Sequence, residues 1–441
     1  MDPIRNPYAP GAGQRPPQLA GRDGELQAFE LTLERLTRGR PERSLVLTGL
    51  RGVGKTVLLN ALRSAAVRRQ WGTGKLEARP DTSIRRPLAA ALHLAVRELG
   101  LPAGDEGGQH ALGVLKSFAL RSPSAGRSAS RSGRGATSSG DRWQPGIAVP
   151  AVAGRADSGD IEIDLVELLA DVAGLAADRG RGIALFIDEM QDLAPADVSA
   201  LCAAVHEIGQ LGQPFIVVGA GLPHLPAVLS ASKSYSERLF RYARVDRLDR
   251  AAADLALRGP ARDEAADLTD QALAALYATT AGYPYFVQAY GKAAWDVAPS
   301  SPITADDVAV AAPQAEAELA VGFFGSRYER ATPAEREYLH GLADVMADLQ
   351  ECGGPGAAED GASVEAASQS GATVPDGRAD DRIRADDGVP TAAIAERLGR
   401  RPQSLSPARD ALIKKGLVFS AERGRISFTV PHFDRYLRRS E

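Results

Sequence analysis

The sequence GLRGVGKT at residues 49–56 matches the phosphate-binding pattern G-x-x-x-x-G-K-[ST] at every fixed position. Its flanks fit as well, because residues 44–48 predict a short buried strand and residues 57–69 predict an amphipathic helix. Glycines let backbone N–H groups surround a phosphate, and the N-terminus of the helix adds positive partial charge. We therefore expect the chain to bind a nucleoside triphosphate through Gly49, Leu50, Arg51, Gly52, Val53, Gly54, Lys55, Thr56 and Val57.

A second motif supplies the carboxylates that such a loop needs for hydrolysis. Residues 183–189 (IALFIDE) predict an apolar strand that ends in Asp188 and Glu189. Strands often end in polar turns, so this signal is weak alone, but it becomes strong downstream of a phosphate loop. Lys55 is expected to reach the β- and γ-phosphates, while Thr56 and Asp188 hold Mg²⁺. Glu189 is expected to act as the general base toward the attacking water.

Bulk composition excludes several classes of protein. Of 441 residues, 44% are hydrophobic and 24% are charged, which is ordinary for a globular protein of two or three domains. The net charge of −4 provides no general attraction for nucleic acid, so any DNA contact has to be a local patch. Cys202 and Cys352 lie far apart in unlike contexts and support neither a disulfide framework nor a zinc site. With no signal pattern and no long apolar run, a cytoplasmic location without membrane contact is expected.

Composition also suggests where one part of the chain ends and the next begins. The Ser/Gly/Arg tract within the first large part predicts a disordered insertion, whose arginines either contact phosphates or, as the favoured alternative, belong to a solvated linker. A second tract that is acidic and rich in Gly and Ala also predicts disorder. The expected parts are an N-terminal linker at 1–20, a phosphate-loop domain at 21–249 with the insertion at about 122–140, a helical lid and connector at 250–349, a disordered acidic linker at 350–388 and a C-terminal domain at 389–441.

The order of these motifs resembles that of the AAA+ ATPases. A phosphate loop, LFIDE, a further strand, an Arg-bearing helix and a helical lid follow one another, and the similarity is greatest to origin-recognition and archaeal-type replication initiators and to STAND ATPases. The resemblance implies ATP with Mg²⁺, and residues 17–23 either lie against the adenine or form a plain loop and helix cap. It also implies that Arg238 or Arg241 serves as an arginine finger toward a neighbouring subunit, although a solvated or structural role is the more common one for surface arginines.

Two features depart from the usual AAA+ pattern. The strand predicted at residues 215–218 continues into Gly219-Ala220-Gly221, where AAA+ enzymes typically carry a polar sensor residue. In the lid, Gly282 and Pro284 resemble the nucleotide-contacting GxP element of STAND proteins, although a Gly-x-Pro is also an ordinary helix start. We therefore expect ATP binding to be intact and hydrolysis to be slow.

The C-terminal segment has the pattern of a winged helix. Residues 391–398 and 404–415 predict two helices joined by a turn, and residues 417–419 and 425–430 predict two strands that flank a second turn. In such folds the second helix enters the DNA major groove, while the wing contacts phosphates. The residues expected on double-stranded DNA are Gln403, Ser404, Ser406, Arg409, Lys414, Lys415, Arg423 and Arg425.

These inferences together predict an α/β P-loop NTPase with a parallel sheet, a helical lid and a C-terminal winged helix. The expected function is an ATPase in which Mg-ATP binding and hydrolysis drive a conformational switch coupled to DNA binding. The alternative is a STAND-like switch that acts through protein–protein contacts, with the winged helix as a packing module. A homo-oligomer or a partner protein is compatible with either.

Overall fold

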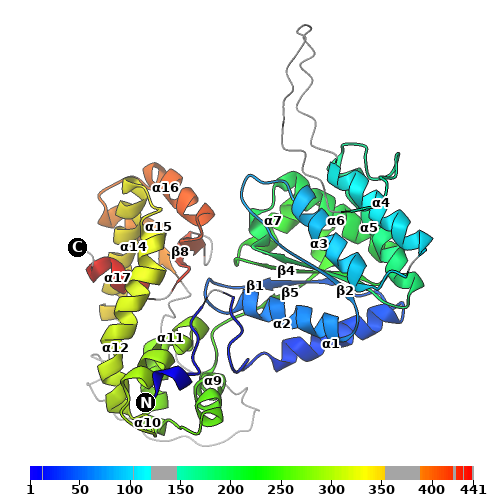
Figure 1. Ribbon diagram of the computed structural model, residues 1–441. Helices are drawn as coiled ribbons and strands as arrows, with labels where there is room; N and C mark the ends of the chain where they lie inside the picture. Colours follow the sequence, from blue (N-terminus) through cyan, green and yellow to red (C-terminus); the bar gives the residue numbers. More distant parts are fainter. Residues whose placement is uncertain are drawn as a thin grey trace, which may run out of the picture. The chain divides into compact units, whose positions relative to one another are not determined.

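The computed structural model describes residues 1–11, 13–102, 104–120, 147–352, 388–420, 424–430 and 432–439. These residues form two compact units, Met1–Ala315 and Glu316–Glu441 (Figure 1). The insertion predicted at 122–140 lies outside the described residues, and so do residues 353–387 of the predicted acidic linker. Each unit is described by itself.

The first unit contains a five-stranded parallel sheet with the order β2-β3-β4-β1-β5. Ser44 of β1 pairs with Phe240 of β5, and Thr48 at the other end of β1 pairs with Gly221 of β4. On the far side, Glu77 of β2 pairs with Asp188 of β3. The strands are β1 (Ser44–Thr48), β2 (Gly72–Glu77), β3 (Ile183–Asp188), β4 (Phe215–Gly221) and β5 (Phe240–Arg244).

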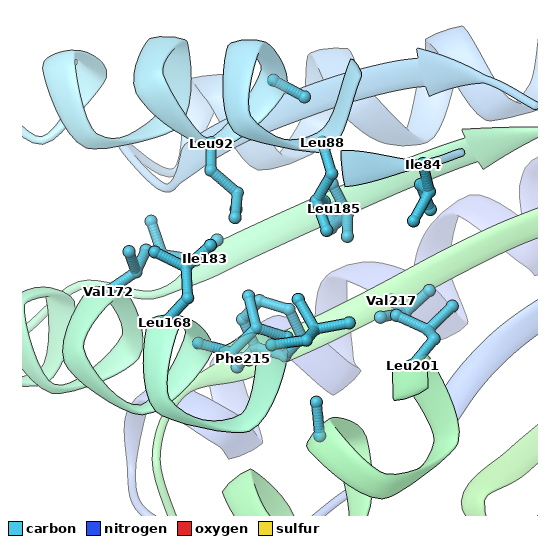
Figure 2. Close-up of a cluster of buried hydrophobic side chains, with 14 of the residues drawn as sticks. Ile84, Leu88, Leu92, Leu168, Val172, Ile183, Leu185, Leu201, Phe215 and Val217 are labelled. Carbon is cyan, nitrogen blue, oxygen red and sulfur yellow. The ribbon is translucent and has the colours of Figure 1, made fainter. Parts of the chain in front are cut away.

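Helices cover both faces of this sheet, which explains why β1, β3 and β4 are buried throughout and apolar almost without interruption. The helices α1 (Asp23–Thr37) and α2 (Lys55–Arg68) lie on one face, and α3 (Arg85–Glu98), α5 (Ile161–Asp178) and α6 (Pro195–Gln210) lie on the other (Figure 1). Figure 2 shows the core beneath the second group, where side chains of α3, α5 and α6 meet those of β3 and β4. The labelled members are Ile84, Leu88, Leu92, Leu168, Val172, Ile183, Leu185, Leu201, Phe215 and Val217.

The remaining helices of the first unit fall into two groups. Near the sheet are α4 (Glu106–Leu120), the 3-10 turn η2 (Met190–Asp192), α7 (Leu225–Ser232) and the short α8 (Ser236–Leu239). After β5 the chain is helical, with α9 (Arg250–Asp263), α10 (Asp270–Thr280), α11 (Pro284–Val297) and α12 (Ala305–Leu319), the last of which crosses the boundary between the two units. The N-terminal turn η1 (Pro3–Arg5) also belongs to this unit.

The second unit combines helices with a small antiparallel sheet of order β6-β8-β7. Its strands are β6 (Val389–Pro390), β7 (Val418–Ser420) and β8 (Arg425–Phe428). Its helices are the π-helical η3 (Ala320–Gly325), α13 (Ser326–Tyr328), α14 (Pro333–Cys352), α15 (Thr391–Arg397), α16 (Pro402–Lys414) and α17 (Phe433–Arg439). The long α14 packs against α15, α16 and α17, so the structure groups this helix with the C-terminal elements and not with the lid.

The α/β fold with a parallel sheet is confirmed, while several element ends differ from those expected. The strand β2 begins at Gly72, and its two glycines weaken the apolar pattern that would reveal a strand in the sequence. The strand β4 continues beyond Val218 to Gly221. The helix α1 begins at Asp23, and Arg22 is its N-cap without a capping side-chain hydrogen bond. Within the described ranges, no helix is long and apolar enough to cross a membrane.

Candidate functional site

The phosphate loop connects the end of β1 to the start of α2. Gly52 and Gly54 have φ angles of 84° and 93°, which residues with a side chain rarely adopt, and a Cβ on Gly49 would clash with the carbonyl oxygen of Val245. Around Gly54, by contrast, the space that a Cβ would enter is open. The loop thus has the shape of an anion cradle at the N-terminus of a helix.

Lys55 lies inside this loop. Its side chain is buried, and Nζ donates hydrogen bonds to the carbonyl oxygens of Gly49 at 2.9 Å and Leu50 at 2.7 Å. Burial lowers the pKa of Lys55 to about 8, although the nearby carboxylates of Glu189 and Asp188 act in the opposite direction. The strands that end at the phosphate loop and at Asp188 both pair with β4 in the same parallel sheet, and the three charges influence one another.

The two carboxylates follow from the end of β3. Asp188 is the last residue of the strand, and its Oδ1 accepts a hydrogen bond of 3.0 Å from the backbone N–H of Glu189. Glu189 has a φ angle of 49°, an uncommon conformation for a residue with a side chain, and the chain then enters the turn η2. In that turn, burial and then the charge of Glu189 raise the pKa of Asp192. Carboxylates therefore crowd this strand end.

The N-terminal segment reaches the same region. The AAA+ resemblance offered residues 17–23 a place against the adenine, but it gave no sign of a contact between Gly13 and Thr56. A Cβ on Gly13 would lie 2.9 Å from Cγ2 of Thr56, and the carbonyl oxygen of Gly13 accepts a bond of 3.4 Å from Asn60. The buried Arg22 donates through Nη2 to the carbonyl oxygens of Val53 (3.4 Å) and Asp246. Arg22 thereby ties the phosphate loop to the segment that follows β5.

The donor set fits Mg²⁺ and a triphosphate. The Thr56 hydroxyl and the Asp188 carboxylate are oxygen ligands of the kind that Mg²⁺ prefers, and Mg²⁺ usually takes only one or two protein ligands beside phosphate. Arg51 Nε is buried without a hydrogen-bond partner, which leaves a cationic donor on the loop. No cluster of three or more His, Cys, Asp or Glu side chains that could hold a metal occurs among the described residues.

Arg238 and Arg241 lie just before and near the start of β5, at the opposite end of the strands from the phosphate loop. Arg238 is on α8, directly before β5, whose first residue pairs with the first residue of β1. Five strand residues, about 16 Å at the usual rise, thus separate Arg238 from the end of β1 that carries the loop. Arg238 lines a surface pocket of about 470 Å³ together with Arg35, Arg43 and His206. Neither arginine is placed to reach the phosphates of its own subunit.

Gly282 and Pro284 lie at the start of α11. Gly282 has a φ angle of 71°, its carbonyl oxygen accepts a bond of 2.8 Å from the N–H of Leu248, and a Cβ on it would clash with the Leu248 carbonyl oxygen. Pro284 occupies the first turn of the helix, and Tyr283 between them is fully buried. The structure thus joins this element to the segment after β5, and contact of Gly282 and Pro284 with nucleotide stays a prediction.

The residues expected on DNA lie in the second unit. Gln403, Ser404 and Lys414 are exposed on α16, and Arg409 pairs with Asp410 at 3.0 Å. Ser404 and Ser406 donate to carbonyl oxygens of their own helix or its cap, Arg401 and Pro402. Arg425 donates a hydrogen bond of 2.6 Å to the carbonyl oxygen of Gly388. Arg423 lies outside the described residues.

Lys415 differs from the other residues expected on DNA because it pairs with a buried carboxylate. Its Nζ atom is 2.6 Å from Oε2 of the buried Glu335 and 2.9 Å from the carbonyl oxygen of Arg330. Burial opposes ionisation of Glu335, but Lys415 and Thr332 outweigh it, so the pKa of Glu335 is lowered. This ion pair joins the end of α16 to the start of α14.

The fold and the phosphate loop define a P-loop NTPase domain. In a comparison with known proteins, residues 18–218 match the family model of the AAA ATPase domain. Residues 379–437 match a domain of unknown function (DUF8462). A search of curated proteins returned no match.

Solved structures also resemble the whole chain at low sequence identity. The Walker-type ATPase of Pyrococcus abyssi is 14% identical over 96% of this chain and 97% of that chain, with a TM-score of 0.55. The RuvB Holliday junction branch migration motor of Thermotoga maritima is 17% identical over 97% and 99% of the two chains, with a TM-score of 0.41. Orc1 of Aeropyrum pernix, in complex with DNA, is 14% identical over 96% and 94%, with a TM-score of 0.39. At these identities the likeness concerns the fold alone.

Proposed function

We propose that this protein is an ATP-binding ATPase of the AAA+ type in which Mg-ATP binding and hydrolysis drive a conformational switch. The observation that carries the proposal is the proximity of Lys55 to Asp188 and Glu189 beside an open glycine cradle. A cytoplasmic location is part of the proposal and rests on the sequence pattern.

Each residue of the site has a distinct role. Lys55 neutralises charge on the β- and γ-phosphoryl oxygens, and the backbone N–H groups of residues 49–57 surround the phosphates. Thr56 and Asp188 hold Mg²⁺, which supplies further charge neutralisation when it is bound. Glu189 orients a water molecule and accepts its proton at a carboxylate oxygen. Gly282 and Pro284 stand at the base of the lid, from which they can transmit nucleotide state.

Arg238 and Arg241 are proposed to act between subunits. Because they lie at the end of the strands opposite their own phosphate loop, an arginine-finger role requires a second copy of the chain. ATPase activity per subunit should then rise with protein concentration, and Arg238→Ala should remove that rise. A rate per subunit that is independent of concentration in the wild type would contradict this part of the proposal.

We also propose that the second unit is a winged helix that binds double-stranded DNA. The order α14, β6, α15, α16, β7 and β8, with an antiparallel sheet, is that of a winged helix, which supports the assignment. The exposed face of α16, with Gln403, Ser404 and Lys414, is the part best suited to a DNA groove.

A second candidate function is a STAND-like switch without DNA binding. It is favoured by the internal engagement of Arg409, Lys415 and Arg425, since these cations already have partners within the unit. The two functions are distinguished by phosphate release from full-length protein, measured with and without duplex DNA at 50 and 200 mM salt. DNA binding that weakens with salt, together with altered ATPase activity, supports the first function. Absence of DNA binding at 50 mM salt supports the second.

Glu189→Gln tests the hydrolytic assignment directly. The variant keeps the shape of the side chain but cannot accept a proton, so phosphate release should fall by about 10²-fold or more while ATP binding is retained. Unchanged phosphate release in this variant would show that Glu189 is not the general base.

A further inference from the structure

The end of β4 carries no polar side chain, and residues of the adjacent turn η2 occupy the space that such a side chain would fill. Gly219 and Gly221 are residues of the buried strand β4, and Gly219 pairs with Ile187 of β3. A Cβ on Gly219 would lie 2.5 Å from Sδ of Met190, and a Cβ on Gly221 would lie 2.7 Å from Oε1 of Gln191. The two glycines therefore leave room for η2 and, at Gly221, also for the side chain of Leu225, whose Cδ2 would lie 2.6 Å from the added Cβ.

Gln191 uses this space to join Glu189 to the chain directly after β4. Its Nε2 donates a hydrogen bond of 2.6 Å to Oε2 of Glu189, and its Oε1 accepts a bond of 3.1 Å from the backbone N–H of Leu222. The two partners fix the orientation of the amide, because a carboxylate can only accept and a backbone N–H can only donate.

The contact restrains the Glu189 carboxylate. Glu189 follows the last residue of β3 in a left-handed backbone conformation with a φ angle of 49°, and the hydrogen bond from Gln191 sets the direction of its side chain. With Oε2 bound by Gln191, Oε1 is the atom left for the proton of a water molecule. A positioned carboxylate is worth more in a reaction than a mobile one, because its orientation is set before the reaction begins.

We propose that Gln191 is the positioning residue for Glu189, and that it replaces the polar side chain which β4 lacks by linking this carboxylate to Leu222. This inference rests on the proposed ATPase function. It places on η2 the polar group that AAA+ enzymes typically carry at the end of the strand corresponding to β4, and it makes Gly219 and Gly221 requirements of the site. It also means that a displacement of the segment after β4 is transmitted to the proposed base.

The test compares Gln191→Ala and Gly221→Ala in the full-length protein. The first variant removes the amide, and the second introduces a methyl group where Oε1 of Gln191 lies. Both should lower kcat by about 10- to 100-fold with little change in KM, since ATP contacts the phosphate loop and not Gln191. The double variant should be no slower than the slower single variant, because both changes break the same link.

Hydrogen exchange supplies a measurement that does not depend on activity. The Leu222 amide should exchange faster in Gln191→Ala, since its acceptor is gone. Gln109→Ala, which truncates an exposed glutamine on α4, is the matched control and should leave kcat and exchange unchanged.

The possible failures are distinguishable. An inactive wild-type protein that binds ATP would overturn the proposed hydrolytic function. An active wild type with an equally active Gln191→Ala variant would overturn the positioning role of Gln191 alone. Unaltered exchange of the Leu222 amide in that variant would overturn the link to β4 whether or not the protein hydrolyses ATP.

Discussion

The Nζ atom of Lys55 donates a hydrogen bond of 2.9 Å to the carbonyl oxygen of Gly49, the first residue of the same phosphate loop. In this position the ammonium group is removed from water, and its pKa falls to about 8. Binding of a triphosphate would offer it an anionic partner and would raise the pKa again. The charge of the loop is thus linked to its occupancy.

The first prediction concerns the pH dependence of ATP binding. Below pH 8 Lys55 is protonated in the free protein, whereas above pH 8 binding has to take up a proton. The dissociation constant for ATP should therefore rise by about tenfold per pH unit above 8. In Lys55→Arg the side chain stays charged, so this rise should vanish. A fluorescent ATP analogue measured between pH 7 and 9.5 gives the result, and a flat wild-type profile would contradict it.

The second prediction concerns the attachment of the N-terminal segment. Tyr8 is buried, and its hydroxyl donates a hydrogen bond of 2.7 Å to the carbonyl oxygen of Leu257. Its ring contacts Trp295 edge to face, with 6.3 Å between the ring centroids. Tyr8→Ala should lower the free energy of unfolding by about 3–5 kcal/mol. Tyr8→Phe, which loses only the hydroxyl, should lower it by about 1–2 kcal/mol.

Urea unfolding followed by tryptophan fluorescence measures the loss of stability in each variant, and Trp295 lies directly against Tyr8. Ile4→Ala is the control, because Ile4 is 93% exposed and its loss should change stability by less than about 0.5 kcal/mol. Equal effects of Tyr8→Ala and Ile4→Ala would show that the segment is not held by Tyr8.

The parts of the site that could be predicted are those contained in short segments. Residues 49–56 and 183–189 each define a strand end and its ligands locally, and the parallel sheet follows from the alternation of strands and helices. The contact of Gln191 with Leu222 could not be predicted, because it depends on β4 continuing through two glycines that resemble a loop. Arg22 contacts Asp246, 224 residues away, and such distant pairs leave no periodic signal.

The third prediction concerns a buried ion pair in the α/β core. Arg85 Nη2 lies 2.8 Å from Oδ2 of Asp164, and only 5% and 0% of the two side chains are exposed. Asp164→Ala would leave a buried guanidinium without its counterion, which should cost about 3–5 kcal/mol of stability. Asp254→Ala is the control: it breaks the more exposed pair with Arg250 and should cost about 0–1 kcal/mol.

The ion pair between Arg85 and Asp164 also predicts that the protein loses stability as the pH falls. Burial opposes ionisation of Asp164, but hydrogen bonds from Ser158 and Arg85 outweigh it, and the pKa of Asp164 is lowered. Because the folded-state pKa lies below that of the unfolded chain, the stabilisation is complete above the ordinary aspartate pKa and is lost as the pH falls through the folded-state value. Unfolding curves of wild type and Asp164→Asn should therefore converge toward low pH, and a constant difference would contradict this account.

The fourth prediction separates folding from DNA contact at two adjacent lysines. Lys415 is paired with the buried Glu335, whereas Lys414 is exposed and has no partner among the described residues. Lys415→Ala should therefore destabilise the second unit by about 1–3 kcal/mol. Lys414→Ala should leave stability unchanged and reduce the slope of log K against log salt for duplex DNA by about 1.

Both lysines are tested in the full-length protein, with thermal unfolding and DNA titrations at several salt concentrations. An equal reduction of the salt slope in both variants, with stability unchanged in both, would mean that the Lys415–Glu335 pair opens on DNA. A slope unchanged by Lys414→Ala would remove this end of α16 from the DNA interface. Because the two side chains are adjacent in sequence and differ in their partners, the comparison attributes the effect to the ion pair and not to net charge.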